Sequence, residues 1–228
     1  MKKCLIIILF IIMIVACSKS SNDTRNQSDQ LLENNYLTIF DTNNYDLMVS
    51  FRYSKNDHSN IWISPTGSLP ISNFSLKINN ENISLNRFAD NFDGKYNFAE
   101  GRNYNIEINL NNTIYKTRLE MPYKVAITDF TQIFERTQEF TLNWESQRNN
   151  QIQRILLQGY SQSHEVKYPR YLDTKARAFA FEANTTSIED QITSAIIENI
   201  NYSIEDKILF YALVESYLDI NSKTIYNE

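Results

Sequence analysis

The residues that could do chemistry are few and widely separated. His58 and His164 both lie in polar, loop-like surroundings. A serine hydrolase needs a histidine oriented by a carboxylate and a serine on a rigid turn. The segment GYSQS at 159–163 has one glycine where the nucleophile elbow has two. Two isolated histidines do not make a zinc site, and four glycines in the whole chain do not indicate a phosphate-binding loop. We predict no catalytic residue, no metal site and no cofactor.

Carboxylate pairs could suggest glycosidase chemistry. The candidates are Asp90 with Asp93, and Asp129 with Glu135. The first pair lies in DNFDG, which is typical of a turn and lacks the spacing of an EF-hand loop. A calcium site of looser geometry stays open as an alternative. A hydrolase that uses carboxylates alone stays open as a third hypothesis for function.

Aromatic side chains are the best candidates for ligand binding. Trp62, Tyr53, Tyr168 and Tyr171 could form a platform for sugar rings, and Trp62, between polar loops, is expected to be exposed. The alternative is that aromatics on alternating strands fill the core. We assign Trp144 to the core on that ground.

The N-terminus has the features of an export signal. Lys2 and Lys3 precede the apolar run Leu5–Ala16. That run is about 12 residues long, whereas a membrane-spanning helix needs roughly 20. The run ends in Ile14-Val15-Ala16-Cys17, which resembles the lipobox of bacterial lipoproteins. The resemblance implies a signal peptide at 1–16, cleavage before Cys17 and lipid attachment to the Cys17 thiol, so the membrane is the first expected partner.

The location follows from the same resemblance. Ser18 is not aspartate, which by enterobacterium-like sorting implies transfer to the outer membrane. Cys4 leaves with the signal, so the mature domains contain no thiol or disulfide and must be stable through their cores alone. Residues 17–35 are polar and lack periodicity, which predicts a flexible tether.

Net charge argues against one class of partner. The chain carries 22 Lys and Arg against 27 Asp and Glu, for a net charge of −5. Nucleic-acid binding requires basic patches, and none is seen in the sequence. We therefore exclude nucleic acid and keep an envelope protein or a glycan as partners.

Residues 36–122 have the pattern of a first β-sandwich. Short runs alternate apolar and polar residues, and Asn111-Asn112 fits a two-residue hairpin turn. Pro122 ends this unit. Strands are expected at 45–53, 74–78, 83–85, 96–98, 104–110 and 113–121.

Residues 123–228 have the pattern of a second β-sandwich. Thr186 to Glu189 resembles a capping box, and isoleucines then recur every four residues up to Ile200. This predicts a short amphipathic helix near 187–200. For residues 208–220 a buried strand is favoured, with a helix as the alternative. Strands are expected at 125–130, 139–144, 153–160, 175–182 and 208–220.

Part of the chain resembles the Ig-like units of lipoproteins common in Bacteroidetes. Their pattern of Gly-x-x-Tyr, strand, hairpin, strand and Pro is matched by Gly101, Tyr104, Asn111-Asn112 and Pro122. FTLNW, which ends at Trp144, resembles the second strand of a fibronectin type III domain, whose Trp fills the core. The resemblance implies a mainly β fold of two tandem sandwiches.

These observations favour a non-enzymatic lipoprotein of the cell envelope that binds or scaffolds other molecules. Function argued from fold alone is analogy. The alternative is a glycan-binding accessory of a nutrient-uptake complex.

Overall fold

The computed structural model describes residues 22–53, 59–66, 70–130, 133–145, 150–161, 164–187 and 190–222. Cys17 and His58, which the sequence singled out, lie outside these ranges. The chain divides into two compact units, Met1–Ile39 and Phe40–Glu228. Among the described residues, no helix has both the length and the apolar character that crossing a bilayer would require.

In the first unit, the described residues form helix α2 (Asn22–Ile39). The prediction of a tether without regular structure is therefore wrong over most of its length. The segment contains no Gly or Pro, and its Gln, Leu and Glu residues lose little side-chain freedom in a helix. The Thr38 hydroxyl donates to the Asn34 carbonyl one turn earlier, at 2.8 Å.

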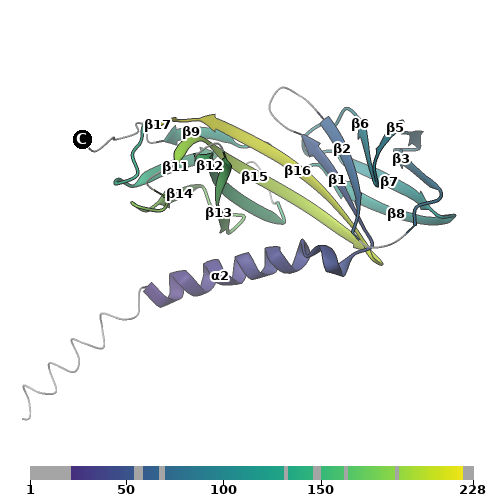
Figure 1. The fold of residues 1–228 in the computed structure, drawn as a ribbon, viewed down its shortest axis with the longest axis horizontal. Coiled ribbons are helices and arrows are strands. Elements are labelled where there is room, and N and C mark those ends of the chain that lie inside the picture. Colours follow the sequence, from purple (N-terminus) through teal and green to yellow (C-terminus); the bar gives the residue numbers. More distant parts are fainter. Residues whose placement is uncertain are drawn as a thin grey trace, which may run out of the picture. The chain divides into compact units, whose positions relative to one another are not determined.

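The second unit is mainly β, which confirms the predicted fold class (Figure 1). After a short 3₁₀ turn, η1 (Thr42–Asn44), it contains β1 (Leu47–Tyr53), β2 (Ser59–Pro65), β3 (Phe74–Ile78), β4 (Glu81–Asn82), β5 (Leu85–Phe88), β6 (Asn91–Lys95), β7 (Asn103–Leu110), β8 (Thr113–Glu120), β9 (Ala126–Phe130), β10 (Ile133–Phe134), β11 (Phe140–Glu145), β12 (Ile152–Ser161), β13 (His164–Leu172), β14 (Ala178–Phe181), β15 (Gln191–Glu205), β16 (Ile208–Asp219) and β17 (Asn221–Ser222).

One large sheet faces two smaller ones. Its strand order is β13-β12-β15-β16-β1-β2-β6-β5. The sheet β4-β3-β7-β8 forms the first sandwich with it, and the sheet β14-β11-β9 forms the second. A two-stranded sheet pairs β10 with β17. Inward-facing residues alternate along β1 and β7, as expected for strands with one face on a core.

The motif Gly101-x-x-Tyr104 has a structural role in the first sandwich. The Tyr104 hydroxyl accepts a hydrogen bond from the Ala99 N–H at 2.7 Å, which is the tyrosine-corner arrangement of Ig-like sandwiches. Gly101 has φ of +66°, and a Cβ there would meet the Tyr123 hydroxyl. Only glycine satisfies both constraints.

The second core contains the predicted tryptophan. Trp144 is 2% exposed and packs among residues of β11, β12 and β15. Phe140 and Leu142 lie on the same face of β11 and are also buried. The assignment of Trp144 to the core is confirmed.

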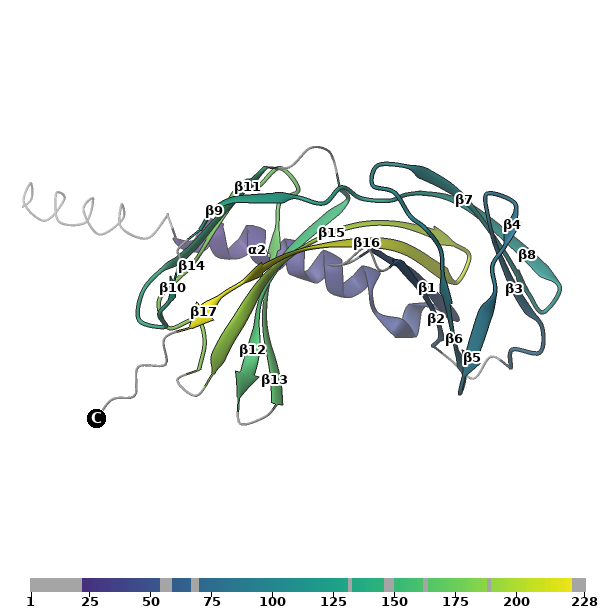
Figure 2. The same cartoon turned by 90° about the horizontal axis from the view of Figure 1, so that it is seen from above.

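The β15–β16 hairpin belongs to both sandwiches (Figures 1 and 2). Alternate β16 residues from Ile208 to Val214 belong to the first core, while Ile192, Ala195 and Ile197 of β15 belong to the second. β1 also pairs in parallel with β16. The predicted division at residue 122 therefore does not separate the two cores, because the second half of the chain completes the first sandwich.

The predicted helix near 187–200 is wrong. β15 occupies Gln191–Glu205, and residues 194–201 are all buried. Ile196 and Ile200 fit a period of two as well as a period of four, and the residues between them include the buried polar side chains of Glu198 and Asn199. β15 lies inside the large sheet and is buried on both faces, so its burial does not alternate and the periodicity alone does not identify a strand. The predicted strand at 208–220 is confirmed by β16.

The predicted strand at 96–98 is also wrong. β6 ends at Lys95, and residues 96–98 have no regular structure. Tyr96 and Phe98 instead place their rings beside each other, with centroids 5.1 Å apart, and Phe98 is a member of the first core. Aromatic content alone indicated a strand where the structure has a core-packing loop.

Side-chain amides of β15 fix the segment that connects the two sandwiches. The Asn199 amide donates to the Tyr123 carbonyl at 2.7 Å, and the Asn201 amide donates to the Glu120 carbonyl at 3.0 Å. The Gln153 amide donates to Asn199 Oδ1 at 2.9 Å. These amides bond the carbonyls at the end of β8 and in the segment that follows it, and so tie that segment to β15.

The shared hairpin makes a prediction about fragments. A fragment of residues 40–123 lacks β16 and so loses four residues of its core. We expect it to show no cooperative unfolding transition, whereas residues 40–222 should unfold cooperatively. Circular dichroism during urea titration checks this, and a cooperative transition of the short fragment would contradict the shared core.

The amide contacts make a second prediction. Asn199→Ala removes the amide that donates to the Tyr123 carbonyl and takes the Asn199 Oδ1 acceptor from the buried Gln153 amide, and is expected to lower the free energy of unfolding by about 1–3 kcal/mol. Asn105→Ala, at an exposed position on β7, is the matched control and should change stability little. Urea denaturation measures both, and equal effects would show that the Asn199 contacts contribute nothing specific.

Candidate ligand-binding cleft

The four aromatic residues predicted as a sugar platform do not come together. Tyr53 lies at the end of β1 and packs against the first core. Trp62 lies on β2 between the buried residues Ile61 and Ile63, so its side chain points to the opposite face of the sheet, where it is 43% exposed. These two aromatics cannot bind one ring between them.

The other two aromatics lie in the second sandwich. Tyr168 on β13 packs against the second core, and its hydroxyl binds the Asp190 carboxylate and accepts from the Ser187 N–H at 3.1 Å. Burial and the Asp190 contact raise the pKa of Tyr168. Tyr171 is half-buried and pairs with Arg154 on the other face of the sheet. Trp62, Tyr53, Tyr168 and Tyr171 are thus placed separately.

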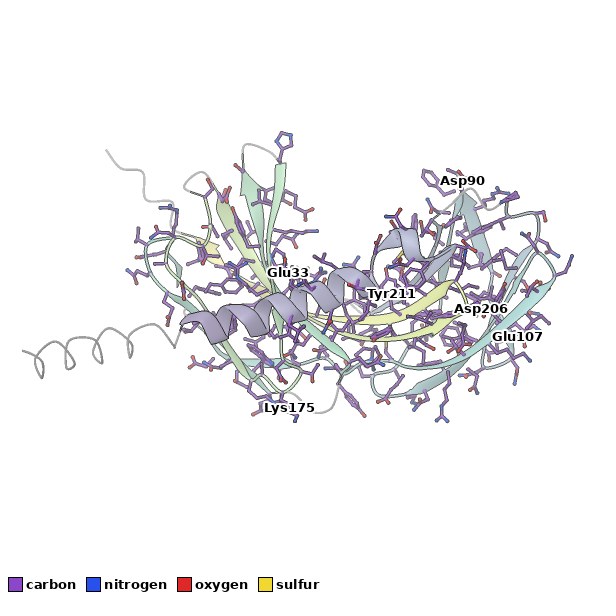
Figure 3. The ribbon with its side chains drawn as sticks, turned by 90° about the horizontal axis from the view of Figure 1, so that it is seen from below. Glu33, Asp90, Glu107, Lys175, Asp206 and Tyr211 are labelled. Carbon is purple, nitrogen blue, oxygen red and sulfur yellow. The ribbon has the colours of Figure 1, made fainter. Side chains whose placement is uncertain are left out.

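The two candidate carboxylate pairs lie in different parts of the second unit. Asp90 lies in the turn between β5 and β6 (Figure 3), and the Asp93 carboxylate accepts from the Asn86 amide at 3.3 Å. Asp129 is exposed on β9, while Glu135 follows β10. Within the part of the chain that the structure describes, no three His, Cys, Asp or Glu side chains group closely enough to hold a metal ion.

A row of charged residues crosses the large sheet. Arg154, Glu198 and Glu215 are register neighbours on β12, β15 and β16. Arg154 forms an ion pair with Glu198, and Arg52 of β1 forms one with Glu215. Both carboxylates are almost fully buried. Burial raises the pKa of Glu198, and Arg154 opposes that shift.

A cleft of about 310 Å³ lies at one end of the first sandwich. Three segments from distant parts of the sequence line it, namely 46, 110–115 and 206–208. Asp206 lies at the tip of the β15–β16 hairpin (Figure 3). Ligand sites in proteins start at roughly 300 Å³, so the volume suits one small ligand.

Hydrogen bonds hold one wall of the cleft. Asn111 and Asn112 both have positive φ, at 49° and 68°, and form the predicted two-residue turn between β7 and β8. The Asn111 side chain accepts from the backbone and hydroxyl of Ser72 at 3.0 and 2.9 Å and donates to the Pro70 carbonyl at 2.9 Å. The turn is therefore fixed to the neighbouring loop.

The backbone also fixes the opposite wall. The Lys207 carbonyl accepts from the N–H groups of Asp46 and Leu47, at 2.8 and 3.4 Å. Thr66 donates its N–H to the Asp46 carbonyl at 3.1 Å. Asp46 and Lys207 are thus held side by side, with 4.0 Å between Asp46 Oδ1 and Lys207 Nζ.

The cleft has an apolar floor and a polar rim. Leu110 and Ile208 are buried members of the first core, and the half-buried Tyr115 packs against that core. The rim carries two carboxylates, one ammonium group and the Thr113 hydroxyl. Such a surface offers both hydrogen-bond donors and hydrogen-bond acceptors beside an aromatic ring.

Sequence reasoning did not find this cleft. Asp206-Lys207 lies between two apolar runs and could have been read as a hairpin turn. Nothing in the sequence placed Asp46 or Tyr115 beside that turn, because the pairing of β1 with β16 joins residues far apart in the chain.

Comparisons with known proteins give the following. No family model matches the chain, and no curated protein matches it. Solved structures that match the chain include the fibronectin(III)-like modules of CbhA from Clostridium thermocellum, at 12% identity and TM-score 0.25, covering 80% of this chain and 97% of that one. A second is the BSP domain of a biofilm-associated protein, at 8% identity and TM-score 0.23, covering 78% of this chain and 30% of that one. A third comprises the FN1–FN3 domains of chicken CNTN1, at 9% identity and TM-score 0.25, covering 76% of this chain and 63% of that one. At TM-scores below 0.5 these likenesses assign no function to this chain.

The charged row makes a prediction. Arg154→Ala leaves Glu198 buried without its cation and is expected to cost about 3–5 kcal/mol of stability at neutral pH. The pKa of Glu198 is raised in the folded state, so folding favours its protonated form, and the loss should shrink as the pH falls toward that raised pKa. Urea denaturation at neutral and mildly acidic pH measures both effects.

Lys77→Ala is the control for this prediction. Lys77 contacts Glu107 at 2.9 Å, but Lys116 contacts the same carboxylate at 2.9 Å and Lys77 is well exposed. Its removal should change stability little. A cost for Arg154→Ala that matches the control, or that grows with acidity, would contradict the assignment.

Proposed function

We propose that this chain is a lipid-anchored, non-enzymatic binding or scaffolding protein of the bacterial cell envelope, attached through Cys17 to the outer membrane, and that the cleft of the first sandwich is its ligand site. The cleft carries the proposal, because it brings polar groups from three distant segments together around a volume of about 310 Å³. The lipobox-like sequence that ends at Cys17 supports the anchor.

The composition of the cleft supports binding in preference to catalysis. Its rim groups, Asp46 and Lys207, face each other as charges of opposite sign. Solvated charges at an open rim are suited to holding a ligand by hydrogen bonds.

A rigid scaffold supports the same role. The Lys207 turn is the end of a hairpin whose strands belong to both cores. Sites on rigid elements keep their geometry without a ligand, which lowers the entropic cost of binding. A lipid anchor on such a protein would present the cleft at a membrane surface, where stable attachment needs more than one acyl chain.

The anchor is tested by labelling. Cells that express the full chain are grown with an alkyne-bearing palmitate, and the protein is probed for the label. We expect labelled protein from the wild type, none from Cys17→Ser, and labelled protein from the control Cys4→Ser, because Cys4 lies in the segment expected to be removed. Label that persists in Cys17→Ser would overturn the anchoring site.

The side of the membrane is tested on the same cells. Protease added to intact cells should remove the labelled protein if its domains face outward, and only lysed cells should lose it if they face the periplasm. The first result favours capture of external molecules, and the second favours a scaffold within the envelope. Recovery of the wild type in the soluble fraction alone would contradict anchoring.

A further inference from the structure

Two opposite charges stand beside each other at the exposed rim of the cleft. Asp46 Oδ1 and Lys207 Nζ are 4.0 Å apart. Direct charged hydrogen bonds are shorter, at roughly 2.7–2.9 Å. A single oxygen atom placed beside both groups can accept from the ammonium group and donate to the carboxylate.

We propose that the cleft binds a neutral, hydroxyl-rich ring, which is a monosaccharide unit either free or at the end of a glycan. This inference rests on the proposed binding role and names its ligand. A hydroxyl group is both donor and acceptor, so it matches a rim that presents carboxylates and an ammonium group together.

The charges of the rim exclude simpler ligands. A small anion would meet Lys207 but also the carboxylates of Asp46 and Asp206. A small cation would meet those two carboxylates but would also be repelled by the ammonium group of Lys207. A neutral ligand with several hydroxyls can bind all three groups without an uncompensated charge.

The floor suits the apolar face of such a ring. Tyr115 offers an aromatic ring that is half-buried against the core, and the buried side chains of Leu110 and Ile208 back the cleft. The C–H face of a sugar packs on surfaces of this kind, while its hydroxyls point to the rim. The arrangement thus provides an apolar floor for one part of the ligand and polar groups for the other.

The backbone of both walls is held in place without ligand. The Asn111 turn is fixed by its bonds to Ser72 and Pro70, and the Lys207 turn by its bonds to the start of β1. Little ordering is needed on binding. Affinity should still be modest, because the cleft is small and open.

The test is an NMR titration of ¹⁵N-labelled protein from residue 40 to the C-terminus, which contains both cores. The probes are methyl glucoside, methyl galactoside and N-acetylglucosamine. Calcium chloride, spermidine and glucuronate are the charged comparison probes. We expect at least one neutral sugar to shift backbone amides of residues 46–47, 111–115 and 206–208, and to leave those of the second sandwich unchanged.

Two variants test the roles of the rim. Asp206→Asn keeps a residue that tolerates the positive φ of 53° at this position, and should weaken sugar binding by about tenfold through loss of a charged hydrogen bond. Lys207→Met removes the ammonium group with little change in length and should weaken it similarly. Asp129→Asn, on the exposed face of β9, is the matched control and should bind like the wild type.

The outcomes separate the two proposals. Sugar-induced shifts at the cleft that the rim variants weaken support the inference. Shifts there with only the charged probes overturn the sugar assignment and leave the binding role standing. Sugar-induced shifts around Trp62 instead would overturn the location. Silence at the cleft with every probe, and with a mixed library of small metabolites, would count against the proposed binding function itself.

Discussion

The cross-strand register of the β15–β16 hairpin is the constraint on which the rest of the structure depends. The two strands pair from Ser194 with Asp219 to Glu205 with Ile208. Residues near the turn complete the first core, and residues near the open end belong to the second. A slip of one residue would exchange the two faces of the hairpin, and it would place polar side chains in both cores at once. Neither sandwich can therefore pack unless this single register is correct. The connection between the sandwiches is fixed by the same strands, because the Val125 N–H donates to Ser216 Oγ of β16 at 2.9 Å.

The proposed cleft inherits its geometry from this hairpin. Ile208 is both the first residue of β16, buried in the first core, and part of the cleft floor. Asp206 and Lys207 precede it directly, so the positions of the rim charges follow from the packing of the core. The Asp46 side of the rim depends on the hairpin as well, because parallel pairing of β1 begins with Leu47 opposite Ile208. A site of this kind needs no separate machinery to hold its groups in place.

Local sequence signals predicted local structure well. Asn111-Asn112 specified a turn because asparagine tolerates positive φ, and alternation along FTLNW placed Trp144 in the core. Prediction of the helix near 187–200 failed because isoleucines spaced by four fit both periods, and a strand's neighbours decide between them. The tether was mistaken for an unstructured segment because polar composition was given more weight than helix propensity.

The cleft could not be predicted at all, since Asp46, Tyr115 and Asp206 meet only through strand pairings between distant segments. Tyr53 and Trp62, two of the aromatics proposed as a sugar platform, lie on opposite faces of the large sheet, and the sequence did not show this because it did not reveal how β1 and β2 pair.

The buried charges of the large sheet show how the sequence selects that pairing. Glu198 and Glu215 lie directly opposite each other, an arrangement that is destabilising by itself. It is tolerated because the strands on either side supply Arg154 and Arg52. The order β12-β15-β16-β1 is the one that gives each carboxylate its own cation, and an alternative order or a shifted register would leave a charge buried alone. Apolar residues at these positions would stabilise many registers equally. The charges contribute little net stability but discriminate among registers, and the selected register is the one that brings Asp206 and Lys207 to Asp46.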